Sequence, residues 1–372
     1  MTRPFDVCIR GAGIVGQTLA LLLSQERLRV GLVGTGAQSD TAAKRDVRAY
    51  ALNAKSKALL ETLRVWPDAE FATAVRQMEV HGDAGGNVSF NAEAQGVEAL
   101  TWIVDVPLLE AQLAKALRFQ PLIELLPAPC DAPLTVVCEG KASVTREELG
   151  VRNAVTPYPQ VAIAGRLRCE LPHGQVARQW FAGGEILAFL PMEGPHGNSV
   201  AFVWSVLKER AADLMAQSDS ALCKELEAAS GSVLGTLEMS GDRGVWPLQW
   251  AQVDRWIGIK ENKAWVLAGD AAHTVHPLAG QGLNLGLEDA AVLAAVLRKR
   301  EYWRGLGDPK LLRRYERTRR AEVQRAALTM HGLQQLFAQP GMGWQSLRNA
   351  GMNGFDRSGM IKKWVARQAM GI

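Results

Sequence analysis

The sequence lacks the features that mark several large classes of protein. Its five cysteines form no Cys-x-x-Cys pair, and an odd, scattered set of thiols is typical of a reducing compartment. No continuous apolar stretch reaches the ~18 residues that a transmembrane helix needs. Asp6 and Arg10 interrupt the apolar N-terminal segment, and no small-residue cleavage site follows it. We therefore expect a cytoplasmic protein without a disulfide framework or a membrane span.

A strong bias toward one charge is also missing. The net charge is +4 and charged residues make up 22% of the chain, which is too weak a basic bias to predict a nucleic-acid partner. Hydrophobic residues make up 48%, so disorder is not expected, and 372 residues suffice for one large or two ordinary domains. No Ser-His-Asp order and no context for a nucleophilic cysteine is present.

What the sequence does contain is a glycine fingerprint near its start. The apolar run Val7 to Ile9 is followed by Gly11, Gly13 and Gly16, then by helix-forming residues and a second strand-like run, Arg29 to Val33. Strand, glycine turn, helix and strand within about thirty residues are the context that a dinucleotide fingerprint requires. Gly11 would allow a tight turn, Gly13 the approach of a pyrophosphate, and Gly16 close helix packing. A glycine turn without a ligand is the less favoured alternative.

A second junction of strand and helix follows much later in the chain. The apolar stretch Ala264 to Ala268 precedes Asp270, which would lie at the carboxyl end of a strand, where ligands gather in open α/β sheets. Gly280 and Gly282 would leave bare backbone amides at the start of a helix, and such a terminus stabilises negative charge. Two such junctions predict a long dinucleotide that is held at both ends.

The rest of the chain divides into a strand-rich part and a helical part. Between Val151 and Trp250, apolar stretches separated by Gly and Pro predict antiparallel strands, which we interpret as a second domain inserted in the first. Arg45 to Trp66 is expected to form a loop and then a helix, and Trp102 to Leu117 a turn and then a helix. From Glu288 onward the composition predicts mostly helix.

These motifs resemble the FAD motifs of the flavin-dependent aromatic hydroxylases, the class that includes p-hydroxybenzoate hydroxylase. The segment HPLAGQGLNLGLED, residues 276–289, is most similar to the signature of the ubiquinone-biosynthesis hydroxylases. Segments 46–66, 138–146, 172–191 and 351–371 are also similar to that family, so the resemblance covers nearly the whole chain.

The resemblance implies an α/β fold with three parts. These are a Rossmann-like FAD-binding domain, an inserted antiparallel β-sheet substrate domain and a helical C-terminal region. The FAD-binding domain is expected to comprise residues 1–66, 102–150 and 251–305, the substrate domain residues 67–101 and 151–250, and the helical region residues 306–372.

The resemblance also implies an activity. FAD would be reduced by NADH or NADPH, and the reduced flavin would bind dioxygen as a hydroperoxide at its C4a carbon, whose distal oxygen is attacked by an electron-rich ring. The expected substrate is a polyprenylated quinone precursor in ubiquinone biosynthesis. A membrane surface, as for a peripheral protein of the inner membrane, or a quinone-biosynthesis complex is an expected partner.

The family's cofactor contacts fall on named positions of this chain. By resemblance, Asp270 binds the ribityl or pyrophosphate part of FAD, Pro277 lies along the isoalloxazine ring, and Arg48 faces the flavin or the pyrophosphate. No catalytic side chain and no metal site is assigned. The full set of expected cofactor contacts is Gly11, Gly13, Gly16, Arg48, Glu139, Asp270, Pro277, Gly280, Gly282, Leu283 and Asn284.

Several positions depart from the family pattern. Gly34 stands where a carboxylate usually holds the adenosine ribose, Pro107 aligns with a family arginine, and Glu139 replaces an aspartate. The stretch between Leu117 and Glu139 is also short for this family. These departures favour, as the alternative, a degenerate flavoprotein that acts as a non-catalytic scaffold in a quinone-biosynthesis complex. A flavin-dependent halogenase is disfavoured because no W-x-W-x-I-P segment is present.

Some conspicuous side chains have two interpretations each. His273 and His276 could meet a metal, but no carboxylate or cysteine cluster completes a site, so a structural role beside FAD is favoured. Trp204, Trp246 and Trp250 could line an aromatic pocket or pack within a sheet.

Basic residues near the C-terminus leave a similar choice. Residues 360–372 combine apolar positions near helical spacing with Lys362, Lys363 and Arg367, and could pack on the FAD domain or lie at a membrane surface. A run of arginines is expected on one helix, where it forms a solvated face or, as the alternative, meets anionic lipid. The run consists of Arg313, Arg314, Arg317, Arg319, Arg320 and Arg325.

Overall fold

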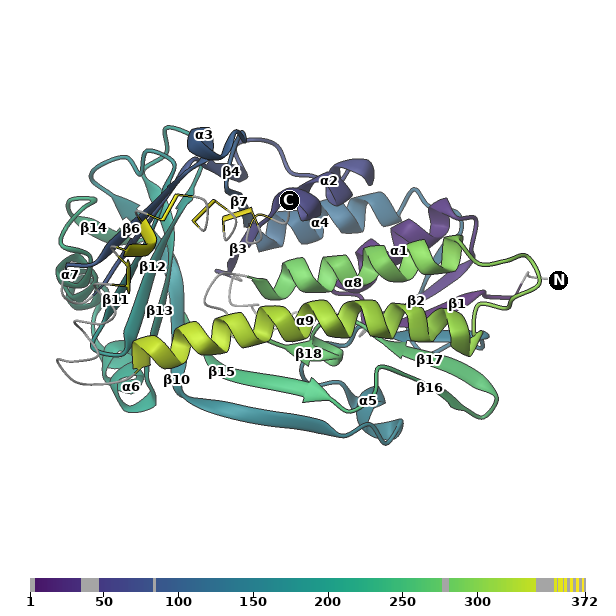
Figure 1. Cartoon of the computed structure of the whole chain (residues 1–372). Helices are drawn as coiled ribbons and strands as arrows, with labels where there is room; N and C mark the ends of the chain where they lie inside the picture. The colour runs from purple at the N-terminus through teal and green to yellow at the C-terminus, as the bar shows by residue number, and fades with distance from the viewer. Residues whose placement is uncertain are drawn as a thin grey trace.

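The computed structural model describes residues 4–34, 47–82, 85–275 and 281–338, together with 351, 352, 354–356, 358, 359, 362, 363, 366, 367 and 370. Within these residues, no helix is both long enough and apolar enough to cross a membrane. The described chain forms three sheets, and its long helices pack around the largest parallel one (Figure 1).

A six-stranded sheet forms the half of the molecule that contains the N-terminus (Figure 1). Its neighbours are parallel, except for an antiparallel pair at one edge. The central strands are short apolar runs that are almost completely buried, as strands covered by helices require. In spatial order the strands are β16 (Ile257–Lys260), β17 (Lys263–Leu267), β9 (Leu134–Val137), β1 (Val7–Arg10), β2 (Val30–Val33) and β8 (Ile123–Leu126).

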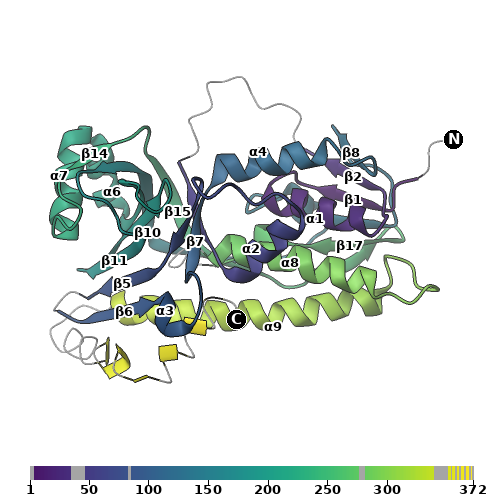
Figure 2. The ribbon, with the colours of Figure 1, turned by 90° about the horizontal axis from the view of Figure 1, so that it is seen from above.

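Long helices cover this sheet and share its core. They are α1 (Ile14–Gln25), α4 (Val106–Leu117), α8 (Gln281–Arg298) and α9 (Pro309–Ala338). Helices α1 and α8 lie side by side in both views (Figures 1 and 2). Their close approach needs a glycine, because a Cβ on Gly286 would lie 2.8 Å from Cγ2 of Val15. Helix α9 is tied to the sheet by Tyr315, whose hydroxyl donates a hydrogen bond to the carbonyl oxygen of Leu267 at 3.0 Å.

A nine-stranded sheet forms the other half of the molecule. Its neighbours are antiparallel, except that β11 and β5 are parallel. In spatial order the strands are β18 (His273–Thr274), β15 (Gly244–Val253), β10 (Asn153–Cys169), β13 (Ser199–Leu207), β12 (Glu185–Met192), β11 (Val176–Ala182), β5 (Gln77–His81) and β6 (Asn87–Asn91), with β14 (Leu237–Met239) paired to β10.

The two faces of this sheet have different partners. Helices α6 (Lys208–Ala216) and α7 (Asp219–Ser230) cover the outer face, seen at the left of Figure 1. Phe202 and Trp204 on β13 point into the core under these helices. Because side chains alternate along a strand, Ala201, Val203 and Ser205 belong to the opposite, inner face.

A small antiparallel sheet lies between the two halves (Figure 2). It consists of β3 (Ala49–Leu52), β7 (Thr101–Asp105) and β4 (Ala72–Val75), accompanied by α2 (Ala54–Thr62) and α3 (Ala92–Gln95). The expected loop before α2 and the expected turn before α4 were wrong, because both are strands. Ala49 to Leu52 pair with Asp105 to Trp102, so each segment acquires its strand conformation from a distant partner that no local pattern reveals.

The architecture confirms the predicted α/β fold. A parallel sheet with helices on its faces is interrupted by a largely antiparallel sheet, and α9 provides a long helix toward the C-terminal side. Strand β10 is 17 residues long, and together with β15 it runs from one half to the other along the lower edge in Figure 1. The two halves are therefore joined by continuous strands, and the space between them forms the site.

Candidate cofactor and substrate site

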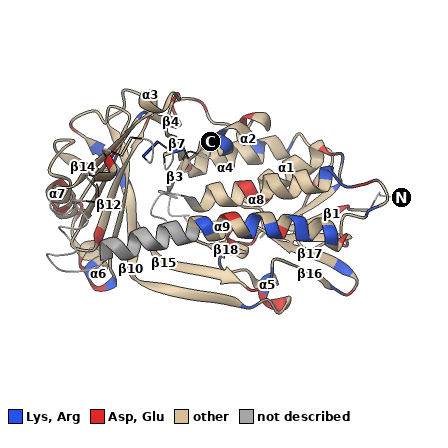
Figure 3. Cartoon of the chain, viewed as in Figure 1, with Lys and Arg blue, Asp and Glu red and all other residues tan. Residues whose placement is uncertain are grey.

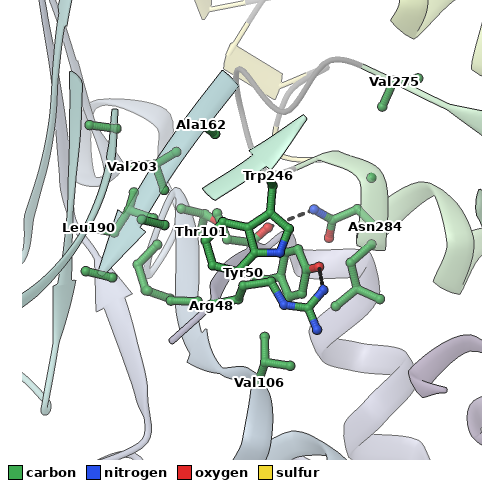
Figure 4. Close-up of a pocket in the computed structure, with 18 of the residues that line it drawn as sticks. Arg48, Tyr50, Thr101, Val106, Ala162, Leu190, Val203, Trp246, Val275 and Asn284 are labelled. Carbon is green, nitrogen blue, oxygen red and sulfur yellow. Dashed lines mark hydrogen bonds between the residues drawn. The ribbon is translucent and has the colours of Figure 1, made fainter. Parts of the chain in front are cut away.

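A cavity of about 580 Å³ lies between the two halves. Its lining comes from the glycine turn before α1, from β3, from the turn η1 (Gly269–Ala271), from the start of α8 and from the inner face of the nine-stranded sheet (Figure 4). Six of the predicted cofactor contacts line it, five from the two junctions and Arg48 from the segment before β3. They are Gly13, Arg48, Asp270, Gly282, Leu283 and Asn284.

The first junction has the geometry of a phosphate cradle. Gly11 has a φ of +112°, and a Cβ there would lie 2.4 Å from the carbonyl oxygen of Cys138. A Cβ on Gly16 would lie 1.9 Å from the carbonyl oxygen of Gly11, whereas one on Gly13 would meet nothing within 4 Å. Gly11 and Gly16 are thus needed by the chain itself, and Gly13 leaves open space toward the cavity.

The start of α1 offers unsatisfied amides beside this open space. Gly13 is the N-cap, so no side chain caps the helix, and the first turn contains no acidic residue. Ile14 and Val15 of that turn line the cavity. The amides at a helix start lack intrahelical acceptors and favour negative charge, so the residues present fit the pyrophosphate of a dinucleotide.

The second junction places a carboxylate at the same cavity. Gly269 turns the chain with a φ of +63°, and the half-buried Asp270 follows. Burial raises the pKa of Asp270, although Lys141 and His273 act in the opposite direction. Within the described chain no group donates a hydrogen bond to this carboxylate, so its oxygens are available to hydroxyl groups of a ligand. Gly282 adds open space at the start of α8, because a Cβ there would meet nothing within 4 Å.

Behind the second junction lies a buried ionic network that the sequence did not predict. Asp289 on α8 is fully buried, and its Oδ2 accepts hydrogen bonds from the Gly269 amide at 2.8 Å and from Nε2 of His273 at 2.7 Å. Its Oδ1 accepts from Nε of Arg319 on α9 at 2.7 Å. Burial alone would raise the pKa of Asp289, but His273 and Arg319 outweigh it and lower the pKa. The network holds the turn that carries Asp270.

Arg319 therefore corrects one expectation from the sequence. It does not belong to a solvated helix face, because it is fully buried and its Nη2 also donates to the carbonyl oxygen of Leu285 at 3.1 Å. Burial would lower the pKa of its guanidinium, but Asp289 and Glu288 raise it. His273 has the structural role that was favoured, stacked on Trp256 with ring centroids 5.1 Å apart. No group of potential metal ligands occurs among the described residues.

Arg48, which directly precedes β3, and Tyr50 on β3 project into the cavity (Figure 4). Nη1 of Arg48 donates to the hydroxyl of Tyr50 at 3.3 Å, which fixes the guanidinium above the strand. Tyr50 was not predicted, because the strand that presents it was taken for a loop.

The side chain of Asn284 makes hydrogen bonds within the protein, and its predicted contact with the cofactor stays a prediction. Its Oδ1 accepts from the amide of Asn53 at 2.9 Å and from the hydroxyl of Ser56 at 2.7 Å, and its Nδ2 donates to the carbonyl oxygen of Ala51 at 2.8 Å. The side chain therefore fastens the start of α8 to β3 and α2. Leu283 and the backbone of this turn remain on the cavity side.

The carboxylate of Glu139 is bound by nearby residues of the protein itself. It accepts hydrogen bonds from the hydroxyl of Ser143 at 2.7 Å, from the amide and hydroxyl of Thr145 at 3.0 and 2.5 Å, and pairs with Nε of Arg10 at 3.2 Å. Burial would raise the pKa of Glu139, but the bonds from Thr145 and Ser143 lower it. Glu139 thus braces the turn before α5 (Val144–Glu148), and the next residue, Gly140, lines the cavity.

The other predicted positions have simple outcomes. Pro277 and Gly280 lie outside the described residues. Gly34 directly follows β2, and a Cβ there would lie 3.3 Å from that of Ala12, so little room exists for a side chain. Pro107 lies in the first turn of α4 and does not line the cavity.

The inner face of the nine-stranded sheet supplies the remaining wall. Three adjacent strands contribute small side chains, and the register places Ala164 opposite Val203 and Val203 opposite Ala188. None of these residues was predicted to line the site, although small residues at every second position of a strand are a signal that the sequence contains. The lining from these strands includes Ala162, Ala164, Ile186, Ala188, Leu190, Ala201, Val203 and Ser205.

The structure shows where the three tryptophans and two residues of the C-terminal segment lie. Trp246 lines the cavity, and Trp204 packs in the core under α6. Trp250 packs against the cluster of Tyr158, Ala162 and Leu248, two of which line the cavity. In the C-terminal segment, Ala366 and Met370 are buried against residues 92–100. These two residues therefore pack on the protein, as one alternative expected, but their contacts are beside β6, in the part predicted to bind substrate, and not on the part predicted to bind FAD.

Comparison with known proteins agrees with this geometry. Residues 129–329 match the family described as FAD binding domain. The chain is 30% identical, over 98% of its length, to ubiquinone hydroxylase UbiL of Rhodospirillum rubrum, of which it covers 89%. It is 27% identical to the 3-demethoxyubiquinol 3-hydroxylase of Escherichia coli, with 100% of this chain and 99% of that protein covered. Its fold is similar to p-nitrophenol 4-monooxygenase PnpA of Pseudomonas putida, with a TM-score of 0.77, 15% identity, and 100% and 99% of the two chains covered.

Proposed function

Because the chain belongs to the FAD binding domain family, we propose that it is an FAD-dependent monooxygenase that hydroxylates the aromatic ring of a polyprenylated quinone precursor in ubiquinone biosynthesis. Ring C–H, dioxygen, NAD(P)H and a proton give ring C–OH, NAD(P)⁺ and water. The reductant, NADH or NADPH, belongs to the proposal. FAD, when bound, supplies the electron transfer to dioxygen and the activated oxygen atom.

Residues of both junctions would bind FAD, each junction a different part of it. The amides at the start of α1 receive the pyrophosphate, and Gly13 gives it room. Asp270 would accept hydrogen bonds from sugar or ribityl hydroxyls, because it lines the cavity and no described residue donates a hydrogen bond to its carboxylate. Arg48 would face the flavin, and the first turn of α8, which contains Gly282, would bring the positive end of that helix close to it and stabilise negative charge on the reduced flavin.

The inner sheet face has the shape and chemistry to receive the ring. Alanine side chains on neighbouring strands leave a flat, apolar wall, and Trp246 flanks it. An apolar wall excludes water from the place where oxygen is transferred, which suppresses loss of the reactive oxygen to solvent. The contribution of these residues is therefore orientation and water exclusion. In this proposal residues 1–66, 102–150 and 251–305 bind FAD, and 67–101 with 151–250 bind the ring.

Such a substrate dissolves in lipid, so contact with a membrane surface is part of the proposal. Arg313, Arg314 and Arg317, here called the α9 arginines, are exposed and have no ion-pair partner among the described residues. Figure 3 shows basic residues along this helix. Each basic residue near an anionic surface contributes about 1 kcal/mol, and salt screens that attraction.

The observation that carries the proposal is that the uncapped start of α1, Gly282 in the first turn of α8 and the Asp270 carboxylate, which accepts no hydrogen bond from the described residues, meet at one cavity. The test is a titration of purified protein with FAD, followed by NADPH or NADH oxidation with and without a ring substrate. We expect saturable FAD binding and reductant oxidation that the ring substrate accelerates. FAD binding without any turnover would favour the alternative, a non-catalytic scaffold, and absence of FAD binding would refute both.

A further inference from the structure

The inner face of the nine-stranded sheet carries an apolar row that leads away from the cofactor end of the cavity. Ala201 on β13 pairs with Leu190 on β12, and Ala177 on β11 pairs with Met78 on β5, which pairs with Phe90 on β6. All five residues line the cavity. Neighbouring strands lie about 4.8 Å apart, so the row extends on the order of 19 Å.

The far end of this row is closed by the C-terminal segment. Ala366 and Met370 are buried in one apolar cluster with Ala92 and Leu100, and Met78 and Phe90 pack against that cluster. Ala366 and Met370 also line the cavity themselves. A segment that lies more than 260 residues beyond β6 in the chain therefore forms part of the cavity wall.

Specific polar contacts hold the segment in this place. Oδ1 of Asp356 accepts a hydrogen bond from the amide of Ser89 on β6 at 3.1 Å and pairs with Nζ of Lys362 at 2.7 Å. The ammonium of Lys362 lies 5.5 Å from the ring centroid of Phe90. The ring centroids of Phe90 and Phe355 lie 6.2 Å apart. These contacts place the segment on the β5–β6 hairpin.

The chemistry of the row is unlike that of the cofactor end. The cofactor end is lined by three charged residues, Arg48, Lys141 and Asp270. The five residues of the row are aliphatic or aromatic, although Arg178 and Gln179, which follow Ala177 on β11, line the cavity as well. The hydroxyl groups of a phenol or quinol find no hydrogen-bond partner among these five side chains. A long apolar group can bind there, because each buried methylene contributes about 0.8 kcal/mol.

We propose that the row from Ala201 to Phe90 binds an isoprenoid or alkyl substituent of the ring, and that Ala366 and Met370 close the row against the end of that substituent. This inference rests on the proposed function and extends it, because it assigns the wall that selects substrates by their apolar chain. It makes the C-terminal segment a specificity element and not only a packing element.

The test compares ring substrates that carry no side chain with those that carry one, two or three isoprene units. In the wild-type protein loaded with FAD, kcat/KM is expected to rise with each added unit until the row is filled. Ala366→Phe fills the end of the row, so it should lower kcat/KM for the longest substrate by about tenfold, the loss from roughly two unburied methylenes. The substrate without a chain should be affected less than twofold.

The matched control is Arg367→Phe. Arg367 is the next residue and is exposed, so the same ring introduced there should leave the dependence on chain length unchanged. Equal losses for both substrates in Ala366→Phe would overturn the assignment. No rise of kcat/KM with chain length in the wild type would overturn it as well.

A second measurement needs no variant and so does not depend on Ala366→Phe being folded. A substrate analogue with a photoreactive diazirine at the end of its chain is bound to the wild-type protein and irradiated. We expect cross-links in the peptides that contain Phe90 and Met370, and cross-links confined to other peptides would contradict the proposal. Turnover of neither substrate series would refute the proposed function, whereas turnover that ignores chain length would refute only this inference.

Discussion

Replacing Asp289 with Asn is expected to damage both the fold and the cofactor site, although residue 289 does not line the cavity. The wild-type carboxylate accepts three hydrogen bonds, two on Oδ2 from Gly269 and His273 and one on Oδ1 from Arg319. An amide has one oxygen and one NH2 group. Whichever way it is turned, the NH2 faces either the Gly269 amide or the Arg319 guanidinium, so one buried donor loses its acceptor.

The expected magnitude follows from burial. Asp289 and Arg319 are both fully buried, and breaking such a pair costs about 3–5 kcal/mol. Arg319 keeps two partly exposed partners, Glu288 and Glu322, so the expected cost lies at the lower end of this range, about 3 kcal/mol. The Gly269 turn also becomes free to move Asp270, so FAD affinity should fall by about tenfold or more, which corresponds to about 1.4 kcal/mol per factor of ten. Denaturant unfolding of the apo-protein and fluorescence titration with FAD measure the two effects separately.

Acid pH gives a further readout that a simple packing defect would not produce. The pKa of Asp289 is lowered in the folded state, because His273 and Arg319 outweigh its burial. Its stabilisation is therefore fully present above the unfolded pKa of about 3.9 and is lost as the pH falls below it through the folded pKa. The Asp289→Asn variant should lack this part of the acid dependence.

The matched control is the neighbouring Glu288→Gln. Glu288 is 29% exposed and pairs with Lys55 at 3.5 Å and with Arg319 at 3.1 Å. Partly exposed pairs contribute about 0–1 kcal/mol, so this variant should remain close to wild type in stability and in FAD affinity. If Asp289→Asn costs less than about 1 kcal/mol and leaves FAD binding unchanged, the network does not position the turn.

Three further outcomes are expected. Asp270→Ala should weaken FAD binding by about ten- to a hundredfold, the loss of a charge-assisted hydrogen bond, without lowering the unfolding temperature of the apo-protein; an unchanged dissociation constant in calorimetry would mean that Asp270 does not contact FAD. Gly16→Ala should abolish FAD binding or soluble expression, because its Cβ would lie 1.9 Å from the Gly11 carbonyl oxygen, and a stable yellow variant would contradict the tight packing. Replacement of the α9 arginines by Gln should abolish weak, salt-sensitive co-sedimentation with anionic vesicles, and binding that ignores both salt and the substitution would rule out that surface.

The parts of the site that the sequence predicted are those fixed by local chain geometry. Gly11 and Gly16 are required because carbonyl oxygens occupy the space of any Cβ, and such a requirement leaves a readable spacing in the sequence. Asp270 follows an apolar strand directly, so its place at the carboxyl end of that strand could be inferred without knowing the neighbours of the strand.

The parts that the sequence did not predict depend on distant segments. Strands β3 and β7 exist because they pair with each other, and the predicted loop and turn came from reading each segment alone. Asp289 and Arg319 lie on different helices, and nothing in an arginine-rich helix distinguishes the one arginine that turns inward from its solvated neighbours. The contact of the C-terminal segment with β6 is likewise a matter of tertiary packing.

The measurement that tests the account most directly follows the oxygen atom. Purified protein with FAD, NADPH or NADH, and a prenylated phenol is incubated under dioxygen labelled with the heavy oxygen isotope, and the product is analysed by mass spectrometry. The account predicts one labelled oxygen atom in the ring hydroxyl and none from labelled water. A product without the label, or reductant oxidation that yields no hydroxylated ring, would contradict the assignment of this cavity as a hydroxylation site.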